Sequence, residues 1–197
     1  MIMLMNSVTV FCGSSEGYDP VHRETAYELG VKLAERKIRM VYGGAKVGLM
    51  GVVADAILEN GGEVIGVIPE FLKTVEIAHE GLTELITVGT MHERKLKMNE
   101  LCDGVITLPG GFGTLEEMFE MLTWGQLGLH SKPIGLLNIN GYYDALAALC
   151  TNMVSEGFLS ECNRTMLLTS PLVDELLEMM DSYVAPDTPK YITKQTT

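Results

Sequence analysis

The segment GVITLPGGFGTLEEMFE (residues 104–120) contains the unit from which the whole fold is built. It opens with a short apolar run rich in Val and Ile, which is typical of a strand covered on both faces. It closes with apolar residues at helical spacing. Between the two, Gly110, Gly111 and Gly113 allow the backbone to turn tightly and to approach a ligand closely. The segment therefore predicts a strand, a ligand-binding turn and a helix.

The same alternation of apolar runs and helical patterns extends along the chain. Helical stretches such as HRETAYELGVKLAER (22–36) separate the apolar runs. The predicted strands are 7–13, 38–44, 63–69, 84–89, 104–110, 133–140 and 165–170. This order predicts a single-domain, Rossmann-like, three-layer α/β fold with a parallel sheet of about seven strands. We expect the domain to span residues 1–184 and to be followed by a mobile tail, 185–197, where periodicity is lost.

Composition and charge exclude several classes of partner. The 197 residues are 47% hydrophobic and 20% charged, with a formal net charge of −12. Nucleic acid needs a basic footprint, so none is expected as a partner. The chain begins without a basic leader and has no apolar run of membrane-spanning length, so no membrane partner is expected. The four cysteines form no CxxC pair, which predicts reduced core residues in a cytoplasmic protein. The thirteen methionines are interpreted as adaptable core filler.

The glycine-rich and polar segments all follow predicted strands. They are CGSSEG, YGGAKVGLMG, IPE, VGTMHERK, PGGFGTLEE and NINGYY. In an open parallel sheet the carboxyl ends of the strands share one edge, where ligands bind. We therefore expect the site to lie along that edge.

The PGGFGT turn is the strongest candidate for holding an anion. Free N–H groups at a helix start, together with the helix dipole, form a phosphate cradle. Thr114 is predicted to cap the helix. The turn is not a Walker A loop, since no G-K-[ST] follows, and Glu116 stands where a dinucleotide fingerprint has its third glycine. The structural alternative is a tight strand-to-helix turn without a ligand.

Two other turns offer weaker candidates. YGGAKVGLMG (42–51) is a second glycine-rich strand-to-helix turn, in which Gly43 and Gly44 allow close approach and Lys46 is either a phosphate ligand or a solvated lysine. CGSS places the hydroxyls of Ser14 and Ser15 at the end of the first strand. These hydroxyls either contact a ligand or cap a turn.

TMHERKLK (90–97) places two cations near a helix start. Thr90 and Glu93 have the spacing of a capping box, which explains Glu93 structurally. Arg94 and Lys95 face the positive end of the helix dipole, which costs roughly 0.3–1 kcal/mol each. Such a cost at the ligand edge indicates a functional task, and the planar guanidinium of Arg94 suits a phosphate or a developing anion. The alternative is a solvated basic patch.

The helix after PGGFGT divides into faces. The predicted buried stripe is Leu115, Met118, Phe119 and Leu122, and the predicted polar flank is Glu116, Glu120 and Thr123. Glu117 lies nearly opposite the buried stripe. From spacing alone it is equally well explained as the partner of Thr114 in a capping box.

The sequence contains no pattern for two other kinds of site. The four histidines lack paired metal-ligand spacing, so no metal site is assigned. No G-x-S-x-G elbow is present either.

With VFCGSS, YGGAKVGLMG, GVIPEFL, MHERK and PGGFGTLEE in this order, the sequence resembles the Lonely guy (LOG) family from about residue 7 to residue 180. These are cytokinin riboside 5′-monophosphate phosphoribohydrolases and their bacterial relatives, historically often mislabelled lysine decarboxylases. MHERK combined with PGGFGTLEE is the specific part of the resemblance. It implies hydrolysis of the N-glycosidic bond of a nucleoside 5′-monophosphate, without metal or organic cofactor, by a homodimer.

The resemblance also implies roles for individual residues. Arg94 and Glu117 match the catalytic pair. The implied substrate contacts are Glu76, Lys95, Gly111, Phe112, Gly113, Thr114, Leu115, Glu116 and Thr123, and Ser14, Gly43 and Gly44 are weaker candidates. Two rival functions share parts of this pattern. A nucleotide or molybdenum-cofactor carrier needs the phosphate cradle but no glutamate beside the ribose, and a lysine decarboxylase needs a Schiff-base lysine.

Overall fold

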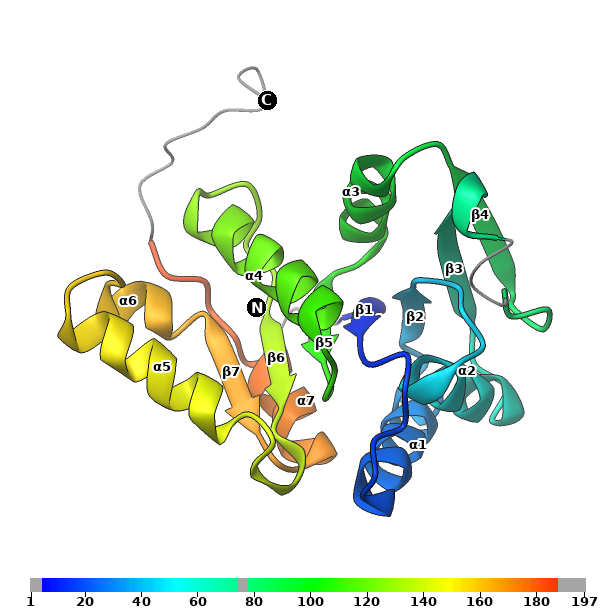
Figure 1. Ribbon diagram of the computed structural model, residues 1–197, viewed down its shortest axis with the longest axis horizontal. Coiled ribbons are helices and arrows are strands. Elements are labelled where there is room, and N and C mark those ends of the chain that lie inside the picture. Colours follow the sequence, from blue (N-terminus) through cyan, green and yellow to red (C-terminus); the bar gives the residue numbers. More distant parts are fainter. Residues whose placement is uncertain (1–4, 74–77, 188–197) are drawn as a thin grey trace.

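The computed structural model describes residues 5–73 and 78–187, and these form a single three-layer α/β unit (Figure 1). The strands are β1 (Ser7–Phe11), β2 (Arg39–Tyr42), β3 (Val64–Pro69), β4 (Glu84–Val88), β5 (Gly104–Thr107), β6 (Ile134–Leu137) and β7 (Leu167–Ser170). All pair in parallel, in the order β4-β3-β2-β1-β5-β6-β7. Each predicted strand is present, so the predicted fold class is confirmed.

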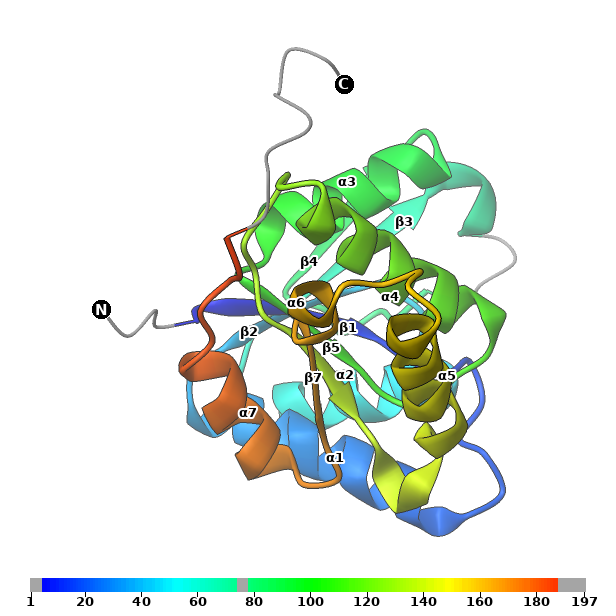
Figure 2. The same cartoon turned by 90° about the vertical axis from the view of Figure 1, so that its left-hand side faces the viewer.

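The helices cover both faces of the sheet (Figure 2). They are α1 (Pro20–Glu35), α2 (Gly48–Glu59), α3 (Met91–Leu101), α4 (Phe112–Gln126), α5 (Asp144–Ser155), α6 (Glu161–Arg164) and α7 (Val173–Asp181), with short 3-10 turns η1 (Glu70–Leu72) and η2 (Ile139–Gly141). Side chains of α1, α2 and α7 form one apolar core with the sheet, and those of α3, α4 and α5 form the other. Both faces are dry, which explains why the strands are apolar without alternation.

The connection from β4 through α3 to β5 sets the position of the site. The chain runs outward from β1 to β4 and then returns to place β5 on the other side of β1. The strands β1 and β5 are neighbours, and the loops that follow them diverge. The space between these two loops is the crevice where open α/β sheets bind ligands. The amide of Gly13 donates to the carbonyl of Pro109 at 3.0 Å and joins these two loops.

After α7 the backbone has no regular structure in the described part of the chain. Residues 183–187 form neither helix nor strand. Residues 188–197 lie outside the described residues, so the predicted mobility of the tail stays a prediction.

Helices α1 and α2 pack closely at Gly30. A Cβ added there would lie 2.6 Å from the Cβ of Ala56 and 2.8 Å from the carbonyl oxygen of Val53. The small residue is needed because the second contact is with backbone, which cannot rotate away.

We predict that Gly30→Ala destabilises the protein. Alanine gains about 1 kcal/mol of intrinsic helix propensity over glycine. Overpacking at a rigid contact costs about 1–3 kcal/mol, so the net change in the free energy of unfolding should be unfavourable. Urea titration measures it, with Glu24→Ala on the exposed face of α1 as the control. A stabilised Gly30→Ala variant would show that α1 and α2 separate easily.

Candidate active site

A cavity of about 390 Å³ lies at the carboxyl edge of the sheet, between the glycine turns and α3. Its lining brings together predicted site residues that lie far apart in the sequence: Ser14, Gly43, Arg94, Gly111, Phe112, Gly113, Thr114 and Glu117. Its apolar lining includes Cys12, Met50, Leu72, Met91 and Met98. The structure thus brings residues of the turns after β1 and β2, of η1 and of helices α3 and α4 into one cavity, and its volume lies in the range of small-molecule sites.

Arg94 is buried at the wall of this cavity. Its side chain is 6% exposed, and it is the one lysine, arginine, aspartate or glutamate of the described residues that belongs to the buried class. Its Nη2 donates to the carbonyl oxygen of Gly43 at 2.9 Å. A Cβ on Gly43 would lie 2.1 Å from that nitrogen, so the glycine makes room for the guanidinium. A buried charge is costly unless it is hydrogen-bonded, and the sequence has placed a glycine where the bond is needed.

The helix start that carries Arg94 is capped by Thr90 as predicted, but Glu93 accepts from the amide of Gly89 instead of from that of the cap residue. The Thr90 hydroxyl accepts from the amide of Glu93 at 3.1 Å, and the Glu93 carboxylate accepts from the amide of Gly89 at 2.7 Å. Both caps lie on the outer side of the turn. Arg94, one residue further on, faces inward. The capping residues therefore orient α3, and Arg94 does not belong to a solvated basic patch.

The start of α4 differs from the prediction at Thr114. The N-cap is Gly111, the helix begins at Phe112, and Thr114 is a buried residue of the first turn rather than the cap. A Cβ on Gly110 would lie 2.2 Å from the Thr114 hydroxyl, so the loop packs directly onto this side chain. The amides of the first turn have no acceptor within the helix. The residues of this turn line the cavity, so their amides are available to a ligand there.

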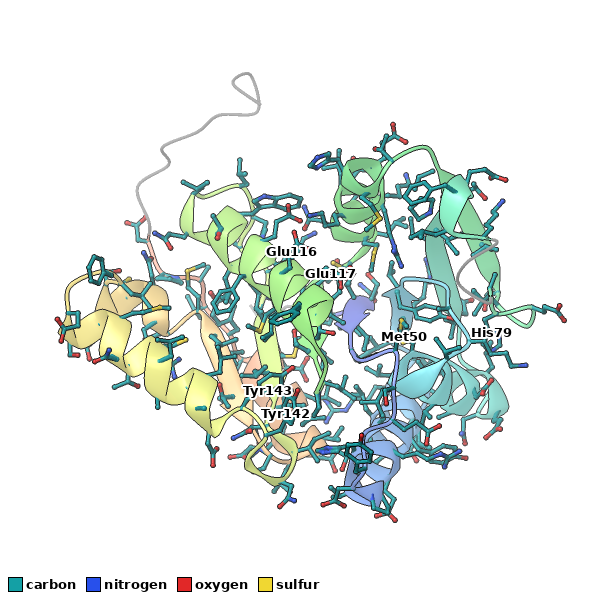
Figure 3. All side chains as sticks on the ribbon, in the orientation of Figure 1. Met50, His79, Glu116, Glu117, Tyr142 and Tyr143 are labelled. Atoms are coloured by element: carbon teal, nitrogen blue, oxygen red, sulfur yellow. The ribbon has the colours of Figure 1, made fainter. Side chains whose placement is uncertain are left out.

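This start position also removes the capping explanation of Glu117. A capping box requires the glutamate at the third helical position, whereas Glu117 is the sixth residue of α4. The buried residues of α4 are Thr114, Met118, Met121 and Gly125, so Glu117 flanks the buried face instead of lying opposite it. The prediction failed because a threonine and a glycine carry no apolar signal. Figure 3 shows Glu117 and Glu116 on α4, and of these two Glu117 lines the cavity.

The negative charge of Glu117 affects the pKa of the Cys12 thiol, which also lines the cavity. The pKa of Cys12 is raised, first by burial and second by the negative charge of Glu117. Cys12 therefore stays a neutral thiol at physiological pH. It contributes a small apolar surface beside the carboxylate, not a nucleophile.

Lys95 and Glu116 form a separate cluster beside the cavity. The Lys95 ammonium lies 2.8 Å from Glu116 and 3.0 Å from Glu120. Desolvation alone lowers the pKa of Lys95, but its two carboxylate partners outweigh it and the net pKa is raised. The ammonium links α3 to α4 and is not among the residues that line the cavity.

The remaining predicted contacts are placed elsewhere or not described. Leu115 packs against the apolar core under α4. Thr123 donates to the carbonyl of Phe119 at 2.7 Å and lines a different cavity, toward α5. Gly44 is buried behind Gly43 with a φ of +82°. Glu76 lies outside the described residues. For all of these the substrate contacts stay predictions.

Two tyrosines that sequence reasoning did not assign hold the β5–α4 loop from behind. Tyr143 donates to the carbonyl of Leu108 at 2.8 Å in a buried bond, and Tyr142 donates to the carbonyl of Gly110 at 2.8 Å (Figure 3). Tyr142 also lines a neighbouring cavity of about 550 Å³ that shares Gly13, Ser14 and Gly111 with the first. The available signal was the NINGYY segment at the carboxyl edge.

Known proteins resemble this chain over most of its length. A family model described as "Possible lysine decarboxylase" matches residues 50–180. The cytokinin riboside 5′-monophosphate phosphoribohydrolase LOG2 of Arabidopsis thaliana is 45% identical over 177 residues, which cover 90% of this chain and 83% of that protein. LOG7 of the same plant is 47% identical and covers 89% of this chain and 81% of its own length.

Solved structures share the fold at lower identity. The structural genomics target TM1055 superposes with a TM-score of 0.69 at 24% identity, over 91% of this chain and 100% of that chain. The molybdenum cofactor binding protein of Rippkaea orientalis superposes with a TM-score of 0.67 at 22% identity, over 91% and 98% of the two chains. At these identities the likeness establishes the fold alone.

We predict different stability costs for the two tyrosine hydroxyls. Tyr143→Phe leaves a buried carbonyl without its donor and should lower the free energy of unfolding by about 1–3 kcal/mol. Tyr142 is 48% exposed, so water replaces its hydroxyl and Tyr142→Phe should cost less than about 1 kcal/mol. Urea titration of the two variants makes the comparison. Equal costs would mean that Tyr143 does not hold the loop.

Proposed function

The chain belongs to the Lonely guy (LOG) family, and on that premise we propose that it hydrolyses the N-glycosidic bond of a nucleoside 5′-monophosphate. The products are the free base and ribose 5-phosphate. The observation that carries the proposal is one cavity containing the amide-rich start of α4, the buried Arg94 and Glu117. A phosphate site, a cation and a carboxylate are the groups needed to hold a phosphosugar and to attack its anomeric carbon.

The phosphate binds at the helix start. Amides of Gly111 to Thr114 and the positive end of the α4 dipole supply donors within a protein of net charge −12, whose long-range field repels anions. Phe112 and Gly113 are exposed residues at this end. The phosphate is therefore held by these nearby amide donors, and not by the long-range field of the protein.

Glu117 acts on the ribose, one helical turn further in. As the bond between C1′ and the base nitrogen breaks, its electron pair leaves with the base and positive charge grows on the ribose ring. The carboxylate stabilises that charge and orients and deprotonates water for attack on C1′. The proton that water loses balances the one that the base gains on release. Arg94 positions the phosphosugar and Glu117.

The base occupies the apolar part of the cavity. Met50, Leu72 and Met91 contribute apolar side chains to its lining, and Met50 appears at the α2 side in Figure 3. A flat uncharged base suits this wall, and flexible methionines adapt to an added apolar substituent. Adenine and N6-prenylated adenine are therefore the substrates to compare.

Two other functions fit the site less well. A nucleotide or molybdenum-cofactor carrier needs no carboxylate beside the ribose, and the carrier proteins resemble this chain in fold alone. A lysine decarboxylase needs a lysine in the cavity, and the described lining residues include none. Lys95, the neighbouring lysine, is held by two carboxylates that favour its charged form, the opposite of what a Schiff base requires.

A panel of nucleotides tests the proposed function. AMP, GMP, CMP, UMP and N6-prenylated AMP are incubated with the pure protein, and free base and ribose 5-phosphate are quantified. The proposal expects equal amounts of the two products from at least one purine nucleotide. Tight binding without product from any of them would support the carrier.

Glu117→Gln separates catalysis from binding. We expect turnover to fall about 10²–10⁴-fold, the usual contribution of a general base. The affinity for AMP, measured by calorimetry, should change little because the phosphate cradle is intact. Glu178→Gln makes the same change on the exposed face of α7 and serves as the control. Near-normal turnover of Glu117→Gln would contradict the mechanism.

Gly43→Ala tests Arg94 without removing it. The added methyl group meets the guanidinium, and a flexible side chain moves away at little cost in stability. We expect turnover to fall about 10–10²-fold, toward that of Arg94→Ala, because a misplacement of about 1 Å costs as much as 10²-fold. The melting temperature should stay close to that of the wild type. A large loss of melting temperature in Arg94→Ala would make the arginine structural instead.

We further propose that the protein works as a cytoplasmic homodimer. Among the described residues no helix is long and apolar enough to cross a membrane. Leu96 is 52% exposed and lines a cavity of about 580 Å³ with Trp124 and Leu129, at the outer side of α3 and α4. This apolar surface supports a contact with a second copy.

Leu96→Glu tests the homodimer. A charge in the apolar contact should shift the mass measured by light scattering from two chains to one, because an unpaired carboxylate is costly to bury. Glu100→Gln, also at this cavity, removes a charge and should leave the dimer intact. A dimer that survives Leu96→Glu would place the contact elsewhere.

A further inference from the structure

His79 is a buried histidine at the carboxyl edge that the proposed chemistry does not use. It precedes β4 and is 6% exposed, and Figure 3 shows it beside α2. Its Nδ1 accepts a hydrogen bond from the amide of Gly81 at 3.0 Å. Its Nε2 lies 2.8 Å from a carboxylate oxygen of Asp55, which is on α2.

These two contacts determine the tautomer. Because an amide can only donate, Nδ1 carries no proton and Nε2 carries the hydrogen that points to Asp55. The ring thus links two parts of the chain, accepting a hydrogen bond at Nδ1 and donating one at Nε2. One ring nitrogen closes the turn that leads to β4, and the other ties that turn to α2.

The backbone of the same residue reaches the glycine turn after β2. The amide of His79 donates to the carbonyl of Gly44 at 2.9 Å, and Ala78 pairs with Ala45 in an antiparallel bridge. The preceding carbonyl, that of Gly43, accepts the hydrogen bond from Arg94. A continuous series of contacts therefore runs from Asp55 through His79 and the glycine turn to Arg94.

The glycine turn needs such external support. Gly43 and Gly44 have no side chains to pack, and Gly44 occupies the left-handed region with a φ of +82°. Glycines lose more conformational freedom on folding than other residues, so a turn built from two of them holds its carbonyls only where neighbours fix them. A side chain at position 43 would displace the guanidinium of Arg94, which fills that space.

We propose that Asp55 and His79 are a positioning pair for Arg94. They clamp the segment that enters β4 onto α2 and thereby hold the Gly43 carbonyl where it orients the guanidinium. The inference rests on the proposed function, because Arg94 is assigned its role there. Neither residue touches the cavity, so both act through the glycine turn.

Four variants and one control separate the parts of the clamp. Asp55→Ala and His79→Asn break the link to α2, and each should lower kcat/KM for AMP about tenfold, within the range of a small misplacement. His79→Gln extends an amide N–H toward Asp55 and should retain most of the activity, as should Asp55→Asn, which keeps an acceptor. Glu63→Ala removes a carboxylate of similar exposure that pairs with Arg39 at the opposite end of β3 and should have no effect.

A double-mutant cycle shows whether the pair acts through Arg94. In an Arg94→Lys background, which lacks the planar fork, Asp55→Ala should lower kcat/KM by less than about twofold, since coupled residues are not additive. A further tenfold loss in that background would refute the proposal and make the pair a general stabiliser. Equal effects of Glu63→Ala and Asp55→Ala would refute it as well.

Hydrogen exchange tests the clamp without reference to activity. In the nucleotide-free protein, Asp55→Ala should speed exchange of the amides of His79 and Gly81, while Glu63→Ala should not. Unchanged exchange in Asp55→Ala would refute the clamp alone. If the two variants differ in exchange as expected but the wild-type protein hydrolyses no nucleotide, the clamp stands and the proposed function alone is refuted.

Discussion

The hydrogen bond from the buried guanidinium of Arg94 to the carbonyl of Gly43 is the contact on which the site depends. A buried cation is tolerated only with well-placed acceptors, so the surrounding backbone has to be arranged for it. That requirement accounts for the glycine at position 43, for the caps that orient α3, and for the support that the glycine turn receives from the segment before β4.

On the other side of the cavity, α4 resolves an apparent conflict between an anion site and neighbouring carboxylates. In the proposed mechanism the amides of its first turn hold the phosphate, while Glu117, further along the helix, faces the region where positive charge develops. Glu116 is directed away, to Lys95. The proposal thus assigns the two opposite charges of the substrate to successive turns at the start of α4, and the hydroxyls of Tyr142 and Tyr143 hold the loop before this helix.

The fold was predictable because its signals are local and redundant: seven apolar runs, helical spacing between them, and glycine turns at strand ends. The site was predictable as a set of loops, and the pairing of Arg94 with PGGFGTLEE came from the resemblance. What could not be predicted depends on helix registration and on neighbours distant in sequence. Thr114 is buried although threonine carries no apolar signal in the sequence. The hydrogen bonds of the two tyrosine hydroxyls and the contact between Asp55 and His79 form only when β2, β5 and β6 are assembled in the sheet.

We propose that one cavity holds both the phosphate, at the start of α4, and the glycosidic carbon, beside Glu117. The most direct measurement is a crystal structure of the Glu117→Gln variant with bound AMP. We expect phosphate oxygens within hydrogen-bonding distance of the amides of Gly111 to Thr114, with C1′ facing position 117 and the base against Met50 and Met91. A nucleotide bound with its phosphate away from α4, or with C1′ out of reach of position 117, would contradict it.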